Sequence, residues 1–199
     1  LGATVVDPAD LPSHGQYGDT EQEVLLYEFK PGLNAYLAGL GPNAPVRSLK
    51  EVIEFNEKNR DREMPYFGQE TLLRSQEKGP LTEQAYLDAL ARNHRLSRDE
   101  GIDAVMNQYK LDAIVAPGGG PAHATDLIYG DRDGGGSSSP AAVAGYPSIT
   151  VPAGYVSGLP VGLAFFGRRD SEDRLLKYAY ALEQATKVRR APRFLAAVG

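Results

Sequence analysis

Asp112-Ala113-Ile114-Val115-Ala116-Pro117 opens the stretch that decides the fold, and Phe165-Phe166-Gly167 closes it. Between these ends lie three apolar runs, joined by loops rich in glycine, serine and proline: Ala113–Ala116, Ile149–Val151 and Val161–Phe166. Short apolar runs bounded by Gly and Pro are typical of strands buried on both faces, as in α/β proteins. Helical patterns flank the stretch on both sides, so we expect it to form the sheet on which those helices pack.

Composition limits the classes of protein to which the chain can belong. Its 199 residues can form one large domain or two small ones and can bury a sizeable core. The net charge of −5, from 21 basic and 26 acidic residues, argues against a nucleic-acid partner. No apolar run approaches the ~20 residues of a membrane-spanning helix, so no membrane partner is expected.

Cysteine is absent from the chain and histidine is rare. The chain contains no cysteine, which excludes disulfides, thiolate nucleophiles and cysteine zinc sites. This leaves the compartment open, and a cytoplasmic location is our expectation. His14, His94 and His123 lie far apart and no HExxH pattern occurs. We therefore expect neither a metal site nor a cofactor.

Capping patterns and periodicity predict mainly helices outside the central stretch. A short strand is expected at Thr4–Val6. Capping boxes that open at Thr20 and Ser48 predict helix starts, and Lys30-Pro31-Gly32 is expected to interrupt the first of these helices. Further helices are expected at 33–40, 48–59, 69–78 and 82–109, the last with a bend or tight packing at Gly101, and after Asp170 or Ser171.

The segment Asp133-Gly134-Gly135-Gly136-Ser137-Ser138-Ser139-Pro140 allows two interpretations. Glycine amides can converge on an anion or oxyanion, and a serine can act as a nucleophile. A nucleophilic serine also needs a base within hydrogen-bond reach, and His123 is the only histidine nearby in sequence. The other interpretation is a mobile loop that leads into a short helix ending at Ala144, with serine as its cap. Turn and cap preferences favour this second interpretation.

A second glycine-rich segment, Pro117-Gly118-Gly119-Gly120-Pro121-Ala122-His123, follows the first apolar run directly. Such a turn holds a phosphate when a helix begins at once. Pro121 and the lack of a Lys-Ser/Thr pair argue against that arrangement here. We expect instead a loop whose backbone lies close to a pocket, with His123 as a candidate to line it.

Three pieces of the chain closely resemble the amidase signature family in residues, order and spacing. They are Leu111-Asp112-Ala113-Ile114-Val115-Ala116-Pro117, Ser139-Pro140-Ala141-Ala142-Val143-Ala144-Gly145-Tyr146-Pro147-Ser148-Ile149-Thr150-Val151-Pro152-Ala153-Gly154 and Gly158-Leu159-Pro160-Val161-Gly162-Leu163-Ala164-Phe165-Phe166-Gly167. The opening from Leu1 to Pro8 and the helix after Ser171-Glu172-Asp173 also match. The resemblance covers essentially the whole chain.

The resemblance implies an amide hydrolase with a three-layer α/β/α fold around a mixed, twisted sheet. Members of this family use a serine nucleophile, a second serine held by a cis peptide bond, and a lysine, with backbone amides as the oxyanion hole. These residues and the Gly-Gly-Ser-Ser signature of the family precede the part that this chain resembles. The resemblance therefore implies a C-terminal half without catalytic residues, and the start at Leu1, inside a helix–turn–strand pattern, also suggests part of a longer protein.

Substrate-binding roles carry over only to the loops beside the expected pocket. Gly135-Gly136-Ser137-Ser138 imitates the signature but lies where the family has a pocket-side loop. The residues expected to line the pocket are Gly118, Gly119, His123 and Ser138. The expected substrate is a small-molecule amide, and the chain alone is expected to be inactive.

The resemblance also implies a division of the chain and a set of partners. Residues 1–110 would form a mainly helical covering layer after a first strand, 111–167 the sheet with its pocket loops, and 168–199 a terminal helix and tail. The expected partners are the N-terminal half of the same enzyme and a second copy of the chain, because a half-fold exposes sheet edges and an apolar face. Two other functions stay open: a non-catalytic binding or assembly module derived from this fold, and hydrolysis by Ser137 or Ser138 itself.

Overall fold

The computed structural model describes residues 2–130, 135–192 and 194. Asp133 and Gly134 of the predicted glycine–serine loop, and most of the predicted tail, lie outside these residues. The described chain forms two compact units, one from residues up to 14 together with those from 97 onward, the other from residues 15–96. No helix in the described ranges combines the length and the apolar character needed to cross a membrane.

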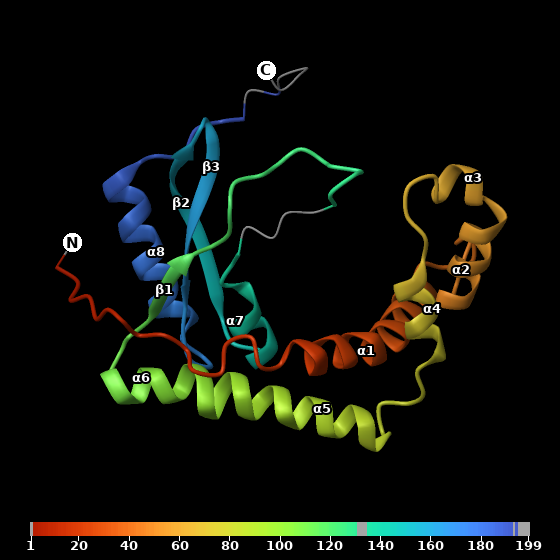
Figure 1. The fold of residues 1–199 in the computed structure, drawn as a ribbon, viewed down its shortest axis with the longest axis horizontal. Helices are drawn as coiled ribbons and strands as arrows, with labels where there is room; N and C mark the ends of the chain where they lie inside the picture. The colour runs from red at the N-terminus through yellow and green to blue at the C-terminus, as the bar shows by residue number, and fades with distance from the viewer. Residues whose placement is uncertain (1, 131–134, 193, 195–199) are drawn as a thin grey trace. The chain divides into compact units, whose positions relative to one another are not determined.

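The first unit is built on a three-stranded sheet of β1 (Ile114–Pro117), β2 (Ser148–Val156) and β3 (Leu159–Phe166), in the order β1-β3-β2 (Figure 1). Both pairings are antiparallel, and Phe166 lies opposite Ile114 on one side and Ser148 on the other. The predicted apolar runs fall in these strands, except that β1 begins at Ile114, one residue after the start of the first run. The prediction of burial on both faces is right for the end of β3, whereas β1 and β2 are edge strands with exposed positions such as Val115.

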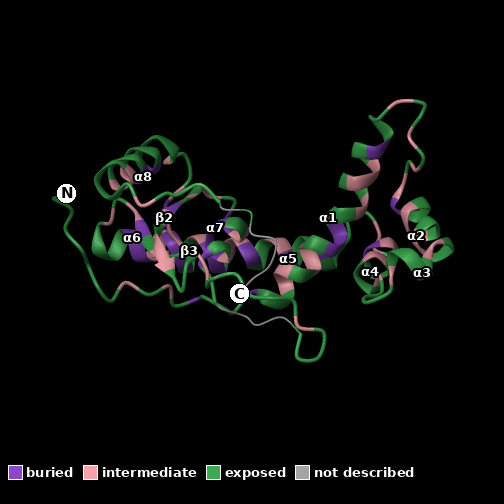
Figure 2. Ribbon diagram, turned by 90° about the horizontal axis from the view of Figure 1, so that it is seen from above, coloured by how far each residue is buried: buried purple, intermediate pink, exposed green. Residues whose placement is uncertain are grey.

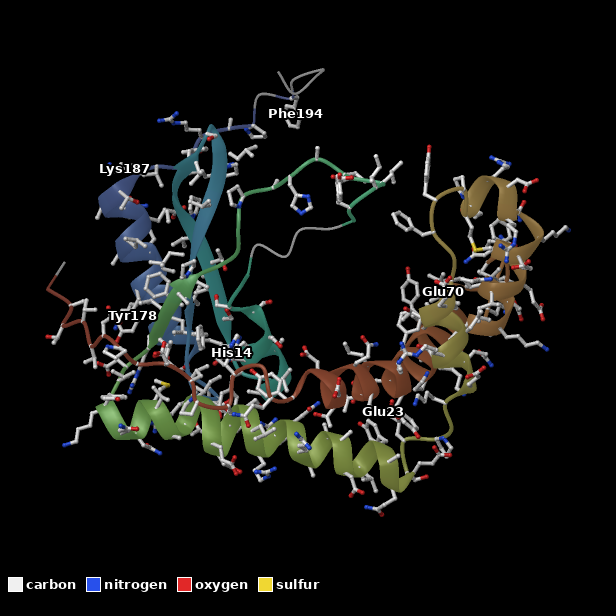
Figure 3. All side chains as sticks on the ribbon, viewed as in Figure 1. His14, Glu23, Glu70, Tyr178, Lys187 and Phe194 are labelled. Atoms are coloured by element: carbon white, nitrogen blue, oxygen red, sulfur yellow. The ribbon has the colours of Figure 1, made fainter. Side chains whose placement is uncertain are left out.

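Helices cover both faces of this sheet. Neighbouring residues of a strand point to opposite faces, and Phe166 packs with Ile102, Met106, Ala141 and Ala144 while Phe165 packs with Leu175 and Ala179. The first face is therefore covered by α6 (Asp103–Tyr109) and α7 (Ser138–Ala144), and the second by α8 (Glu172–Thr186). Tyr178 of α8, labelled in Figure 3, also packs on the second face. These layers agree with the predicted α/β/α fold, and Figure 2 shows the buried residues between them.

The predicted strand at Thr4–Val6 is absent from the structure. Residues 2–10 have no strand assignment, and Val5 is 78% exposed. A strand needs a hydrogen-bonded neighbour, and within the described residues the sheet consists of β1, β3 and β2 alone. Val5 and Val6 have the apolar side chains typical of a strand, but no described strand pairs with them.

The second unit is helical and is organised on α1 (Gly18–Ala38). The predicted interruption at Pro31 is wrong, because α1 continues through it. A proline inside a helix costs ~3 kcal/mol, and contacts along α1 act against this cost. Tyr27 lies 5.6 Å from Tyr86 between ring centroids, and Glu23 (Figure 3) forms a 2.5 Å ion pair with Lys78. Thr20 is not the cap either, since Tyr17 occupies that position and accepts a hydrogen bond from the Thr20 hydroxyl at 3.0 Å.

The remaining helices of this unit follow the predicted positions closely. In α2 (Leu49–Lys58) the predicted Ser48 cap is confirmed, because its Oγ accepts from the Glu51 amide at 3.2 Å. Leu49 is the buried residue of this helix, whereas Phe55 is 47% exposed. The short α3 (Arg60–Glu63) lies between two predicted helices and was not predicted, and α4 (Glu70–Glu77) lies where a helix was predicted.

The predicted long helix is divided into three parts in the structure. It consists of α5 (Gln84–His94), η1 (Arg95–Ile102) and α6 (Asp103–Tyr109). Gly101 has the non-helical angles φ −114° and ψ −109°, which confirms the expected bend there. Glu83 rather than Thr82 precedes the first helical residue.

Candidate functional site

The first candidate loop begins where β1 ends. The Gly118 amide donates to the carbonyl of Gly162 at 2.9 Å, which continues the pairing with β3 beyond Pro117. A Cβ at Gly118 would lie 3.2 Å from Cγ2 of Thr150, and a Cβ at Gly162 would overlap the same methyl group. Glycine at both positions therefore lets the three strands close around Thr150.

A second loop lies directly beside the first. Gly119 and Gly136 form an isolated antiparallel bridge, and the Ser137 hydroxyl donates to the carbonyl of Pro117 at 2.9 Å. Gly135 has φ +70°, a backbone conformation that glycine adopts without steric cost. The structure thus joins the two predicted glycine-rich segments. Both belong to the connection that runs from the end of β1 to the start of α7 (Figure 1).

The three serines of the second loop have different surroundings. Ser137 is 8% exposed, and its hydroxyl bonds to a backbone carbonyl rather than to a base. Ser138 is the exposed first residue of α7, and its side chain forms no hydrogen bond to the described residues. Ser139 is half-buried. The predicted helix after this loop is confirmed as α7, although the residue at its cap position is Ser137 and its side chain does not cap the helix.

His123 lies in the exposed stretch between the two joined loops. Its Nδ1 is 3.2 Å from the carbonyl oxygen of Ala124, the next residue. The structure therefore brings Gly118 and Gly119 together with the loop that leads to Ser138. No described contact joins His123 to them.

One feature of the same stretch was missed in the sequence. The Asp126 carboxylate accepts hydrogen bonds from the Ile128 and Tyr129 amides at 2.9 Å each, and these bonds lower its pKa. This turn presents Leu127, Ile128 and Tyr129 with exposures of 63%, 86% and 81%. An Asp side chain that binds the backbone amide two residues later is a recognised turn signal. The presence of Asp126 in the sequence could therefore have predicted this turn.

A second missed feature anchors the far end of α7. Arg98 donates from Nε to the Ala144 carbonyl at 2.7 Å, and its guanidinium lies 5.6 Å from the ring centroid of Tyr146. The Tyr146 hydroxyl donates to Asp103 at 2.8 Å. Burial, and then the bond to Asp103, raises the pKa of Tyr146 to about 12. This network holds α7, and with it the start of the helix at Ser138, against η1 and α6.

Metal-binding side chains are not clustered in the described part of the chain. Residues 2–130, 135–192 and 194 contain no group of three or more His, Asp or Glu side chains able to hold a metal ion. Within these residues, the joined loops offer backbone amides, a serine hydroxyl and nearby apolar side chains. Such groups can form the wall of a pocket for a small organic ligand.

Comparison with known proteins gives consistent matches. The sequence model of the family described as Amidase matches residues 1–176. An Arabidopsis thaliana protein named as a probable amidase is 40% identical over 201 residues, which cover 98% of this chain and 36% of the relative. A crystal structure of the peptide amidase PAM with the inhibitor chymostatin is 46% identical, with a TM-score of 0.85, and the match covers 92% of this chain and 37% of that one.

A structure of native peptide amidase from Stenotrophomonas maltophilia gives similar values. It is 44% identical with a TM-score of 0.83, over 92% of this chain and 37% of that one. The chain thus spans a little over a third of the length of the relatives that it matches. The comparison of sequences and the comparison of structures both give proteins named as amidases.

Proposed function

Since the chain belongs to the amidase signature family, we propose that it is the C-terminal portion of an enzyme that hydrolyses a carboxylic amide. The observation that carries the proposal is the combination of 46% identity with a TM-score of 0.85 to a peptide amidase over 92% of the chain. The sheet, the joined glycine loops and α7 are all within the range matched by the family.

The proposed reaction divides its tasks between two parts of a longer enzyme. A serine oxygen in the part that precedes this chain attacks the amide carbon, while a second serine and a lysine accept its proton. The carbon–nitrogen bond breaks, the amine departs with a proton, and water then hydrolyses the acyl-enzyme. Backbone amides stabilise the oxyanion that forms in each step.

The proposed contribution of this chain is one wall of the substrate pocket. Gly118 and Gly119 present backbone without side chains, and the bridge to Gly136 holds that backbone in place. Ser138 is exposed at the start of α7 and is proposed to face the substrate. His123, in the exposed stretch between the two joined loops, is proposed to line the same pocket. The Ser137 hydroxyl is bonded to Pro117, which supports a structural role for it rather than a nucleophilic one.

The division of the chain is part of the same proposal. Residues 1–110 would supply mainly helices, 111–167 would supply sheet and pocket loops, and 168–199 would add the terminal helix and tail. The partners would be a small amide, the preceding half of the enzyme and, for the isolated chain, a second copy. A cytoplasmic location, and independence from any cofactor, remain predictions.

A chimera tests the proposed function. In it, the third of the S. maltophilia peptide amidase that matches this chain is replaced by the 199 residues of this chain. The proposal predicts hydrolysis of the parent's own substrate, and no hydrolysis by the isolated chain. A chimera that folds, shown by a native-like circular dichroism spectrum and a cooperative unfolding transition, and yet stays inactive would favour the non-catalytic binding module instead.

A further inference from the structure

A second surface of the first unit has the features of a binding site. A cavity of about 300 Å³ lies at the end of the sheet where β1 begins and β3 ends. Leu111 and Asp112 line it just before β1, and Arg168 lines it just after β3. Gly118 follows the other end of β1, so the cavity and the joined glycine loops lie at opposite ends of that strand.

Positive charge dominates the lining of this cavity. Lys110, Arg168 and Arg174 contribute three cations, and Asp112 contributes the one carboxylate among the lining residues. Arg174 lies 3.8 Å from Asp112, but both side chains are more than half exposed, and such pairs are worth little. Neither Lys110 nor Arg168 forms an ion pair with a carboxylate in the described residues. The lining therefore has a net charge of about +2, counted from these four side chains at neutral pH.

Arg168 is held in place and keeps an unused donor. Its Nη2 donates to Asn107 at 2.7 Å, and its backbone carbonyl accepts from the Ser171 hydroxyl at 2.7 Å. Its Nε is buried and has no hydrogen-bond acceptor among residues 2–130, 135–192 and 194. A buried donor without an acceptor is unfavourable, and most such groups in proteins have a partner. The Arg168 guanidinium, which lines the cavity, therefore has a donor that its neighbours among the described residues leave unused.

The start of α8 adds to the positive potential at this place. Ser171 precedes the helix and lines the cavity, but its hydroxyl bonds to Arg168 and does not cap the helix amides. The N-terminus of a helix carries a partial positive charge. Glu172 and Asp173 follow in the first turn and oppose this effect, but both are exposed and neither lines the cavity.

We propose that this cavity binds a small phosphate-bearing ligand. Planar guanidinium groups donate paired hydrogen bonds that match phosphate oxygens, and a lysine adds a mobile point charge. Arg168 is the central ligand-binding residue, and Lys110 and Arg174 line the same cavity. Met106 and Leu111 add apolar lining for an organic group attached to the phosphate. The proposal does not depend on hydrolysis of an amide.

Titration of the purified 199-residue chain with inorganic phosphate, followed by ¹H–¹⁵N NMR, tests the proposal. Saturable shifts are expected for the Arg168 Nε–H signal and for the amides of residues 171 and 172. Arg168→Gln should raise the dissociation constant about tenfold or more, the effect of removing a charged hydrogen-bond donor. Arg169→Gln is the matched control, because Arg169 is the next residue, is 78% exposed and does not line the cavity.

The possible results distinguish phosphate binding at this site from unspecific attraction of phosphate to surface cations. An unchanged dissociation constant in Arg169→Gln, with a weakened one in Arg168→Gln, supports the site. Non-saturable shifts, equal weakening by both substitutions, or full binding by Arg168→Gln would overturn it. If Arg168→Gln does not fold, the double variant Lys110→Gln, Arg174→Gln replaces it, since both positions are exposed, and unchanged binding there would also overturn the proposal.

Discussion

The Ser137 hydroxyl donates a hydrogen bond to the carbonyl oxygen of Pro117 at 2.9 Å, and this bond joins the loop after β1 to the loop before α7. Beside it, Gly119 pairs with Gly136. A serine hydroxyl used in this way fixes the position of the backbone of both loops. The glycine–serine segment that imitates the family signature therefore has a structural explanation in this chain.

Replacing Ser137 tests that explanation. Ser137→Ala removes a hydrogen bond from a site that is 8% exposed and should lower the free energy of unfolding by about 1 kcal/mol. Ser138→Ala is the matched control, because Ser138 is exposed and its change should stay within about 0.5 kcal/mol. Chemical denaturation measures both variants. Equal stability of Ser137→Ala and wild type would show that the bond does not hold the loops together.

The close approach at Thr150 gives a second prediction. Gly162→Ala would place a methyl group against Cγ2 of Thr150 and should destabilise the fold by about 1–3 kcal/mol. Thr150→Ser removes that methyl group, so the double variant should recover a large part of the loss. Gly154→Ala, also in β2–β3 but with no atom within 4 Å of the new Cβ, should change stability little. A loss that is the same with and without the Thr150 methyl would exclude this contact as its cause.

Local patterns predicted much of the fold because their causes lie within a few residues. The Ser48 cap depends on Glu51, three residues later, and both are visible in the sequence. The antiparallel order of the sheet was not predicted, although a signal existed. Ser157 and Gly158 both have positive φ, at 49° and 80°, and form the tight link between β2 and β3. Such two-residue links are typical of hairpins.

Other features depend on residues that are distant in sequence. The continuity of α1 through Pro31 depends on partners in α4 and α5, which no local pattern contains. The candidate site shows the same limit. The glycine segments were identified separately, but their pairing, the Ser137–Pro117 bond and the Arg98–Ala144 bond each join residues 17 or more positions apart.

Tyrosine ionisation should reduce stability at high pH. The pKa of Tyr146 is raised from 10.0 to about 12 in the folded chain, because burial and Asp103 disfavour the phenolate. This contribution is complete below pH 10, where the unfolded tyrosine is still protonated, and is lost as pH rises from about 10 to about 12. Denaturation from pH 9 to 12 should therefore show falling stability, and Tyr146→Phe should flatten the slope. A slope that is equally steep in Tyr146→Phe would contradict this assignment.

The isolated chain should self-associate through the edges of its sheet. Within the described sheet β1 and β2 are both edge strands, and unpaired edges attract other strands. Val115 lies in β1 and is 49% exposed, so Val115→Lys should lower the average mass measured by sedimentation. Leu176→Lys is the control, because Leu176 is similarly exposed but lies on α8. A monomer at every concentration, or the same effect from both lysines, would argue against edge pairing.

Fluorophosphonate labelling is the most direct test of the division between nucleophile and pocket wall. The probe is applied to the isolated chain and to the chimera with the peptide amidase, and tryptic peptides are analysed by mass. We predict an adduct on a serine of the peptide amidase part of the chimera and none on Ser137, Ser138 or Ser139 in either protein. An adduct on any of these three serines would show that the glycine–serine loop is itself catalytic and would contradict the account.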